Sequence, residues 1–338
     1  MKNVLKYAVS LLIAGGLMWY VFRDIDADVL LAKLTEVRYG WVVLAATIFL
    51  ISYLTRAYRW KVLLQPLGYP RITLLRTVTA VSIGYFANLL VPRLGEITRC
   101  GVLKRLEDVP ITTGLGTVIA ERLIDLVTLL LITLILFVAE FDRLSAFITD
   151  FVAHKADNVG QTIFVAAGIV LLSLGLLWVI WRVYRARLKR SAFFQKVRAF
   201  GTEVVRGLDS IRRIENKAGF WISTVLLWTC YFMMSYVVFF ALPETENLTP
   251  WAGVAVLVMG SFGMAAPVQG GFGTFHALVS AVLVLYGVSE SDGVLFATLV
   301  HGLQTLSFIV FGAVAFVLAS VLTPRKQPAN QSLNTPAV

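Results

Sequence analysis

Charge and cysteine are both scarce in this sequence. Only 15% of its 338 residues are charged and 58% are hydrophobic, and the mean hydropathy is +0.79. Such a composition excludes an ordinary soluble domain, in which about a quarter of the residues are charged. The two cysteines, Cys100 and Cys230, lie far apart and in or beside apolar segments, so they predict neither a disulfide framework nor a metal site.

Motifs for catalysis and cofactor binding are missing as well. The three histidines, His154, His276 and His301, have no second ligand at metal spacing. There is no P-loop, no GxSxG, no HExxH and no nucleotide fingerprint. We therefore expect no cofactor, no metal, no direct use of ATP and no enzymatic activity of the chain itself.

Long hydrophobic runs are what the sequence has in abundance. A run of about twenty apolar residues can cross a hydrocarbon core of about 30 Å. The pattern predicts an all-α polytopic membrane protein with about six full transmembrane helices and two re-entrant hairpins. The runs are 4–22, 40–55, 72–92, 112–139, 161–181, 220–242, 251–267, 274–287 and 294–322. We expect the first run to be a retained helix, because no small-residue cleavage site follows it.

The distribution of the net charge of +10 orients the chain. Segment 182–217 is predicted to form a basic amphipathic helix on an anionic cytoplasmic surface, although a solvated linker is the alternative. Lysine and arginine also gather at 2–6, 56–76, 99–105 and 325–326, whereas 24–36, 140–157, 244–246 and 290–292 are acidic. By the positive-inside rule the basic segments are cytoplasmic, as are both termini. The charge thus indicates a membrane surface and not nucleic acid.

Two glycine- and proline-rich breaks predict the hairpins. Each full span moves the chain to the other side of the membrane. All basic segments stay on the cytoplasmic side only if segment 72–105 enters the membrane from the cytoplasm and returns there. Segment 251–287 must likewise enter from the outside and return to the outside. The expected breaks are Pro92 and Gly95 in the first hairpin and Pro267, Gly270, Gly271 and Gly273 in the second. Pro92 and Pro267 align at the same offset as Gly95 and Gly270, which predicts an inverted repeat with halves 72–139 and 251–320. Chance matching of kinks in apolar sequence is the alternative.

Ionisable residues cluster at the first break. Charges at membrane depth need a partner or water, and Arg93, Glu96 and Arg99 would share one helical face. We expect them to face Glu121, Arg122 and Asp125, giving a network of three cations and three anions near neutrality. The second half would supply a polar wall, formed by Gln269, His301 and Gln304, with His276 more simply explained as a packing residue.

Two interpretations of this network remain open. It can bind a lipid headgroup, because the planar fork of arginine suits phosphate, and Glu96 or Asp125 can take an amine or a proton. Alternatively, it only pins helices together, as buried ion pairs do in many proteins.

Three segments carry a family resemblance: "GYFANLLVPRLGEITRCGVLKR", "ERLIDLVTLLL" and "PVQGGFGTFHALVSAVLVLYGVS". They resemble the signatures of the lysylphosphatidylglycerol synthase transmembrane-region family, flippase-like proteins related to the membrane half of multiple-peptide-resistance proteins. The resemblance covers roughly 4–322 and implies lipid translocation between leaflets. The family usually has a glutamate soon after the last glycine, where this chain has Thr274, Phe275 and His276.

We therefore expect a single flippase-like domain over 1–322, followed by a disordered tail at 323–338. No soluble aminoacyl-transferase domain follows, so the chain is not expected to make an aminoacyl lipid. Membrane lipids are the expected partners, with a separate lipid synthase or glycosyltransferase as a further one, in a bacterial-type cytoplasmic membrane. The alternatives are a non-catalytic scaffold for such an enzyme and, less well supported, an enzyme acting on a polyprenyl phosphate.

Overall fold

The computed structural model describes residues 12, 15–23, 27–143, 202, 205, 209, 214–266 and 268–324. Every regular element in these ranges is helical. The elements are α2 (Ala27–Glu36), α3 (Tyr39–Leu64), η1 (Gln65–Leu67), α4 (Leu74–Leu90), α5 (Leu94–Glu107), α6 (Ile111–Ala139), α9 (Lys217–Phe239), α10 (Pro250–Ala265), η2 (Gln269–Gly271), α11 (Thr274–Leu285) and α12 (Glu290–Val321). The expected all-α class is confirmed for this part of the chain.

Within the described ranges, four helices are long and apolar enough to cross a membrane: α3 continued by η1, α6, α9 and α12. They correspond to four of the six spans expected from sequence. The run 161–181, the segment 182–201 and the tail 325–338 lie outside the described residues, as does most of the run 4–22. The chain is therefore an integral, multi-pass membrane protein.

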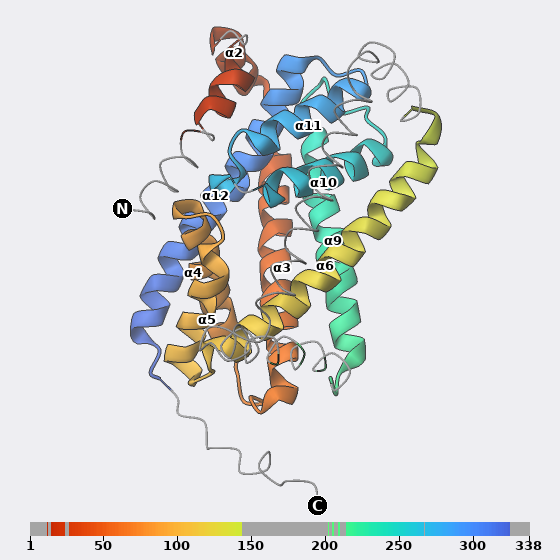
Figure 1. The fold of residues 1–338 in the computed structure, drawn as a ribbon. Coiled ribbons are helices and arrows are strands. Elements are labelled where there is room, and N and C mark those ends of the chain that lie inside the picture. The colour runs from red at the N-terminus through yellow and green to blue at the C-terminus, as the bar shows by residue number, and fades with distance from the viewer. Residues whose placement is uncertain are drawn as a thin grey trace, which may run out of the picture.

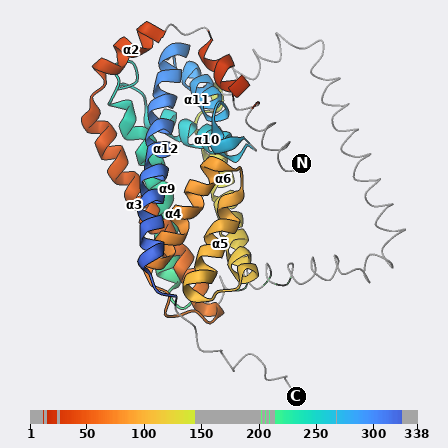
Figure 2. The same ribbon diagram turned by 90° about the vertical axis from the view of Figure 1, so that its left-hand side faces the viewer.

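The shorter helices form two hairpins, α4–α5 and α10–α11. The α4–α5 hairpin occupies the lower half of the molecule and α10–α11 the upper half, and their tips meet between the two ends (Figures 1 and 2). Neither hairpin runs the full length that α3, α6, α9 and α12 run. Each hairpin is preceded and followed by a long helix, so α3 to α6 and α9 to α12 have the same order of elements.

The backbone of the first turn differs from the sequence expectation. Gly95 lies inside α5 and not at the turn, where Arg93 takes the left-handed conformation with φ 65°. Gly95 is needed for close packing instead, because a Cβ there would lie 2.2 Å from the carbonyl oxygen of Gly84 on α4. In the second turn Gly270, Gly271 and Gly273 all have positive φ, which glycine adopts without a steric penalty. Pro267 lies outside the described residues.

Helices from the two halves interlock. α12 packs along α4 and α11, and α3 packs along α9. Arg76 at the start of α4 donates hydrogen bonds to the carbonyl oxygens of Leu106 and Thr323, and pairs with Glu107 at 3.3 Å. These contacts tie the open end of the first hairpin to the end of α12.

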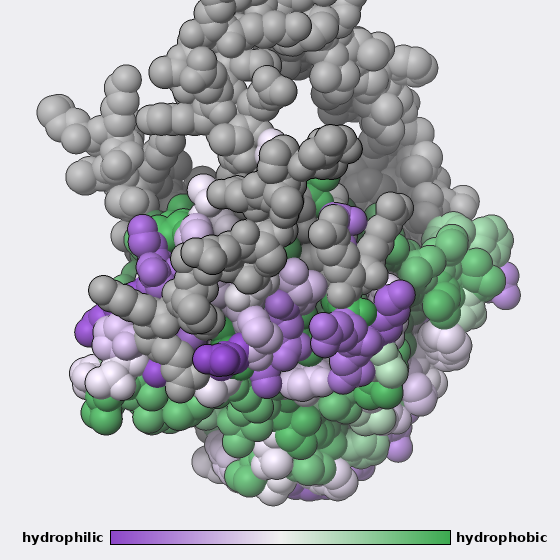
Figure 3. All heavy atoms as spheres, turned by 90° about the horizontal axis from the view of Figure 1, so that it is seen from below, coloured by the Kyte–Doolittle hydropathy of each residue, from purple (hydrophilic) through white to green (hydrophobic). Residues whose placement is uncertain are grey.

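The two ends of the molecule differ in charge. At the end where α2 lies, Lys33 pairs with Asp292 and with Glu244, and Arg38 with Glu246. The opposite end carries the basic residues Lys61, Arg71, Arg76, Lys104, Arg105 and Lys217. Viewed from this basic end, hydrophilic residues gather across the visible described surface, with hydrophobic side chains around them (Figure 3).

Candidate functional site

Five charged side chains from three helices form a buried ionic network, which we call the arginine network: Arg56 and Arg59 of α3, Arg99 of α5, and Glu121 and Asp125 of α6. Glu121 accepts hydrogen bonds from Arg59 at 3.0 Å and from Arg99 at 3.1 Å. Asp125 accepts from Arg56 at 2.9 Å and from Arg59 at 2.7 Å. The most exposed of the five, Asp125, has a side-chain exposure of only 13%.

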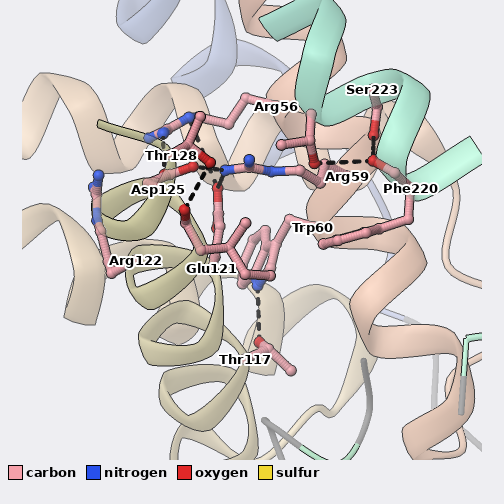
Figure 4. A network of polar contacts seen from close by, with 12 residues as sticks. Arg56, Arg59, Trp60, Thr117, Glu121, Arg122, Asp125, Thr128, Phe220 and Ser223 are labelled. Carbon is pink, nitrogen blue, oxygen red and sulfur yellow. Dashed lines mark hydrogen bonds and ion pairs between the residues drawn. The ribbon is translucent and has the colours of Figure 1, made fainter. Parts of the chain in front are cut away.

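Helical spacing and close packing explain how these residues meet. Arg56 and Arg59 are three apart on α3, and Glu121 and Asp125 are four apart on α6, so each pair lies on one face of its helix. Figure 4 shows both arginines of α3 reaching across to the two carboxylates. On the other side, Gly114 lets α6 approach α5, because a Cβ there would lie 3.0 Å from Cys100 Sγ.

Aromatic side chains surround the arginines. The Arg99 guanidinium lies 4.7 Å from the ring centroid of Trp60, whose Nε1 donates to Thr117 Oγ1 at 3.0 Å. Arg56 lies 5.8 Å from the Tyr85 ring and donates to its hydroxyl at 2.7 Å, and lies 5.9 Å from the Tyr231 ring. Aromatic faces attract cations and exclude water, so they stabilise guanidinium groups away from bulk solvent.

The arginine network carries one more positive than negative charge, since three arginines face two carboxylates. Four of its buried nitrogens, Arg56 Nε, Arg59 Nε, Arg59 Nη1 and Arg99 Nε, have no hydrogen-bond partner among the described residues. A buried cation without a counter-charge is costly. The surplus charge and the unused donors together fit an anion that can accept several hydrogen bonds.

Arg122 and Glu96 lie at the edge of this cluster and not inside it. They pair with each other at 3.1 Å, and the Arg122 side chain is 43% exposed. In Figure 4 Arg122 lies to one side of Glu121 and Asp125, and no dashed line joins it to the other labelled residues. The expectation of a neutral six-membered network is therefore wrong: Arg93 is absent from it, the Arg122–Glu96 pair is peripheral, and Arg56 and Arg59 take the central positions.

Arg93 and Gln269 instead join the two hairpin tips in what we call the tip clasp. Gln269 Nε2 donates to the carbonyl oxygens of Leu89 at 2.9 Å and Leu90 at 2.8 Å, at the end of α4. Arg93 Nη2 donates to the carbonyl oxygen of Ala265, at the end of α10. The last carbonyl groups of a helix have no partner within that helix. Gln269 thus pairs such groups at the end of α4, and Arg93 pairs one at the end of α10.

The remaining polar residues of the second half lie apart from the arginine network. His301 Nε2 lies 2.9 Å from the carbonyl oxygen of Gly270, and its ring centroid is 5.0 Å from that of His276. Gln304 is partly buried on α12. Within the described ranges, no hydrogen bond or ion pair connects Gln269, His301 or Gln304 to the five residues of the network.

Sequence reasoning missed Arg56 and Arg59. It ended the apolar run at residue 55 and assigned both arginines to a cytoplasmic cluster, but α3 continues to Leu64 and both are buried. A signal was present, because Trp60, Leu63 and Leu64 continue the apolar helix beyond them. Two arginines three apart, followed by more apolar residues, are typical of a buried polar site in a membrane helix.

The chain belongs to the family described as the lysylphosphatidylglycerol synthase TM region, whose model matches residues 7–312. It is similar to Glycosyltransferase AglD of Haloferax volcanii, at 24% identity over 85% of this chain and 50% of that protein. It is also similar to the UPF0104 membrane protein MJ1078 of Methanocaldococcus jannaschii, at 25% identity over 73% of this chain and 99% of that protein. The chain thus spans about half the length of AglD and nearly all of MJ1078. These relatives are archaeal, so the family is not restricted to bacteria. No solved structure matches the chain.

Proposed function

We propose that this member of the lysylphosphatidylglycerol synthase transmembrane-region family carries a phosphate-bearing lipid between membrane leaflets without ATP. The observation that carries the proposal is the surplus positive charge of the arginine network, together with its unpartnered guanidinium nitrogens. A phosphodiester brings one negative charge, which balances the surplus. An uncharged hopanoid headgroup brings none, so we favour a phospholipid or a polyprenyl phosphate as cargo.

Arginine chemistry supports phosphate recognition. Arg59 and Arg99 both donate to Glu121 through one nitrogen and hold other donors in reserve. The guanidinium fork can give two parallel hydrogen bonds to two phosphate oxygens, which lysine cannot do. In our proposal these two arginines hold the phosphate, while Glu121 and Asp125 keep them in place. Arg122 and Glu96, at the exposed edge, meet the headgroup first.

The arrangement of the hairpins supports a path through the protein. In the proposed topology the basic end faces the cytoplasm, α4–α5 is re-entrant from that side and α10–α11 from the other, and the two halves form an inverted repeat. Such hairpins place irregular backbone at membrane depth, which is tolerated where it is buried or lines a polar path. The tip clasp closes this path, and the halves rock apart when it opens.

The proposal also accounts for the lipid tails and for the driving force of transport. The lipid tails stay outside the protein against apolar side chains such as Leu130, Leu134 and Val138 of α6, which are all more than half exposed. Because the sequence has no ATPase motif, the driving force comes from an ion gradient, a partner or the lipid gradient itself.

The test is lipid translocation in proteoliposomes. Fluorescent phosphatidylglycerol, phosphatidylcholine and a fluorescent glucosylceramide, which has no phosphate, are compared for loss of signal to a membrane-impermeant quencher. We expect the two phosphate lipids to cross faster than the glucosylceramide. Arg59→Lys and Arg99→Lys should slow this crossing about tenfold, because each keeps the charge but loses the fork.

Arg93→Lys is the matched control, since Arg93 bonds only a backbone carbonyl among the described residues, and lysine can do the same. It should transport like the parent. Equal rates for all three lipids, or equal rates for all three lysine variants, would contradict phosphate recognition by the network.

A second candidate function is a non-catalytic membrane scaffold for a separate lipid synthase or glycosyltransferase. The match to half the length of a protein named as a glycosyltransferase favours it. The same experiment separates the two candidates, because a scaffold alone moves no lipid in any variant, whereas its variants still change the activity of the enzyme it binds.

A further inference from the structure

An apolar groove of about 300 Å³ lies between α4, α5 and α12. It is separate from the arginine network, because Thr98, Val102 and Arg105 of α5 face it, whereas Arg99 of the same helix points to Glu121. Its lining residues are Ile83, Phe86, Ala87, Leu90, Thr98, Val102, Arg105, Leu106, Phe316, Ala319 and Ser320.

Of the polar groups that line the groove, only the Arg105 guanidinium has no partner within the described part of the chain. Thr98 donates its hydroxyl to the carbonyl oxygen of Leu94 at 3.0 Å, and Ser320 donates to that of Val317 at 2.7 Å. Arg105 is exposed and makes no hydrogen bond or ion pair with any described residue. Among the residues that the structure describes, the groove therefore offers a hydrocarbon surface with one unpaired cation, Arg105, at its end.

The position of the groove along the molecule also fits a ligand with an apolar chain and a charged headgroup. Arg105 lies in the last turn of α5, at the basic end, while Leu90 lies at the hairpin tip. The α4 residues that line the groove, 83–90, span roughly 10 Å along the helix. The groove thus runs from the hairpin tip towards the basic end, which faces the headgroups of the cytoplasmic leaflet in the topology proposed above.

We propose that this groove binds one anionic glycerophospholipid, with an acyl chain between α4, α5 and α12 and its phosphate on Arg105. A hydrocarbon chain has no polar groups to satisfy, and the phosphate supplies a counter-charge that Arg105 does not find among the described residues. The volume is at the lower end of the range for small-ligand sites. It suits a single chain better than a helix from a second copy. This lipid is a resident one, held outside the transport path.

The experiment is native mass spectrometry of the full-length chain, released from detergent after titration with equal amounts of phosphatidylglycerol and phosphatidylcholine. We expect the parent to retain one phosphatidylglycerol in preference to phosphatidylcholine. Arg105→Gln should reduce that preference about tenfold, because glutamine has no positive charge to favour the net negative phosphatidylglycerol over the zwitterionic phosphatidylcholine. Thr98→Phe should remove the retained lipid by filling the groove.

Two neighbouring substitutions serve as matched controls. Lys104→Gln makes the same change of charge on an exposed residue that does not line the groove, and Ile97→Phe adds the same ring at a position 53% exposed. Both should bind lipid like the parent.

An equal loss of the preference for phosphatidylglycerol in Lys104→Gln and Arg105→Gln would mean that the basic surface attracts anionic lipid without a specific site. Retention in Thr98→Phe would mean that the groove is not the site, and loss of a dimer signal in that variant would identify a second copy as the occupant. Each of these results overturns the proposal.

Discussion

Arg59 Nη2 donates to Glu121 Oε1 at 3.0 Å, and neither side chain is more than 1% exposed. The pair joins α3 to α6, two of the four helices able to span a membrane. The pair therefore links these two helices and, in our proposal, fixes the position of the phosphate-binding arginine.

Replacing Glu121 by glutamine should strongly destabilise the protein. The change leaves Arg56, Arg59 and Arg99 facing one carboxylate, and removing one partner of a buried pair costs about 3–5 kcal/mol. The measurement is thermal unfolding in detergent. Glu36→Gln is the control, because Glu36 is exposed on α2 and no ion pair with it is found in the described ranges. Equal melting temperatures for both variants would show that the network does not hold the bundle together.

Arg122→Ala should have a small effect on stability. Its partner is Glu96 and its side chain is 43% exposed, and exposed pairs contribute about 0–1 kcal/mol. Arg59→Ala, measured beside it by the same melting experiment, should cost several times more. If Arg122→Ala lowers the melting temperature as much as Arg59→Ala does, Arg122 belongs to the buried network after all.

Gln269→Met should loosen the tip clasp. It removes hydrogen bonds to Leu89 and Leu90, each worth about 1 kcal/mol, while it keeps the length of the side chain. We expect a lower melting temperature and faster lipid translocation, because the closed state loses stability. Gln304→Met is the control, since no hydrogen bond from Gln304 is found within the described residues. Slower translocation in Gln269→Met would argue that the clasp is part of the open state.

Cysteine labelling should assign the two ends to opposite sides of the membrane. Lys104→Cys lies at the basic end, and Glu246→Cys and Glu290→Cys lie at the acidic end. The native Cys100 and Cys230 are both buried and give a low background. In sealed cells, an impermeant thiol reagent should reach positions 246 and 290 from outside, but not 104. Labelling of all three from outside would exclude the proposed hairpin topology.

Alkaline pH should weaken the acidic end. The hydrogen bond from Lys33 to Asp292 raises the pKa of Lys33 above its ordinary value of 10.5. A raised pKa means that the bond contributes fully below the ordinary value and is lost as pH rises through the folded-state value. The melting temperature of the parent should therefore exceed that of Lys33→Met at neutral pH, and the difference should shrink above about pH 10.5. A difference that grows with pH would contradict this assignment.

Much of the fold could be predicted from sequence. The apolar run at 112–139 coincides with α6 to within one residue, and 294–322 lies within a few residues of α12. Local hydrophobicity alone sets the position of such helices. Of the predicted break residues, Pro92 lies in the first turn and Gly270, Gly271 and Gly273 lie in the second, whereas Gly95 lies inside α5 and Pro267 is outside the described residues.

The composition of the site could be predicted only in part. Glu121, Asp125 and Arg99 were included in the expected cluster, but Arg56 and Arg59 were not. The sequence near Arg59 does not say that its partners lie 62 and 66 residues further along the chain. Arg93 was placed wrongly for a similar reason, because the orientation of its side chain depends on α10, in the other half of the chain.

The contact between Arg76 and the carbonyl oxygen of Thr323 can form only when almost the whole chain has been synthesised. These residues are 247 positions apart, and a ribosome adds about 5–20 residues per second. The α4–α5 hairpin is complete at Glu107 and α12 at Val321, so the hairpin waits roughly 11 to 43 seconds for α12 to be synthesised. During that interval the α4 surface that later packs on α12 is not yet covered. Quality-control proteases and membrane insertases have that time in which to act on the hairpin, so a slow codon run before α12 should lower the yield of this protein more than one placed before α4.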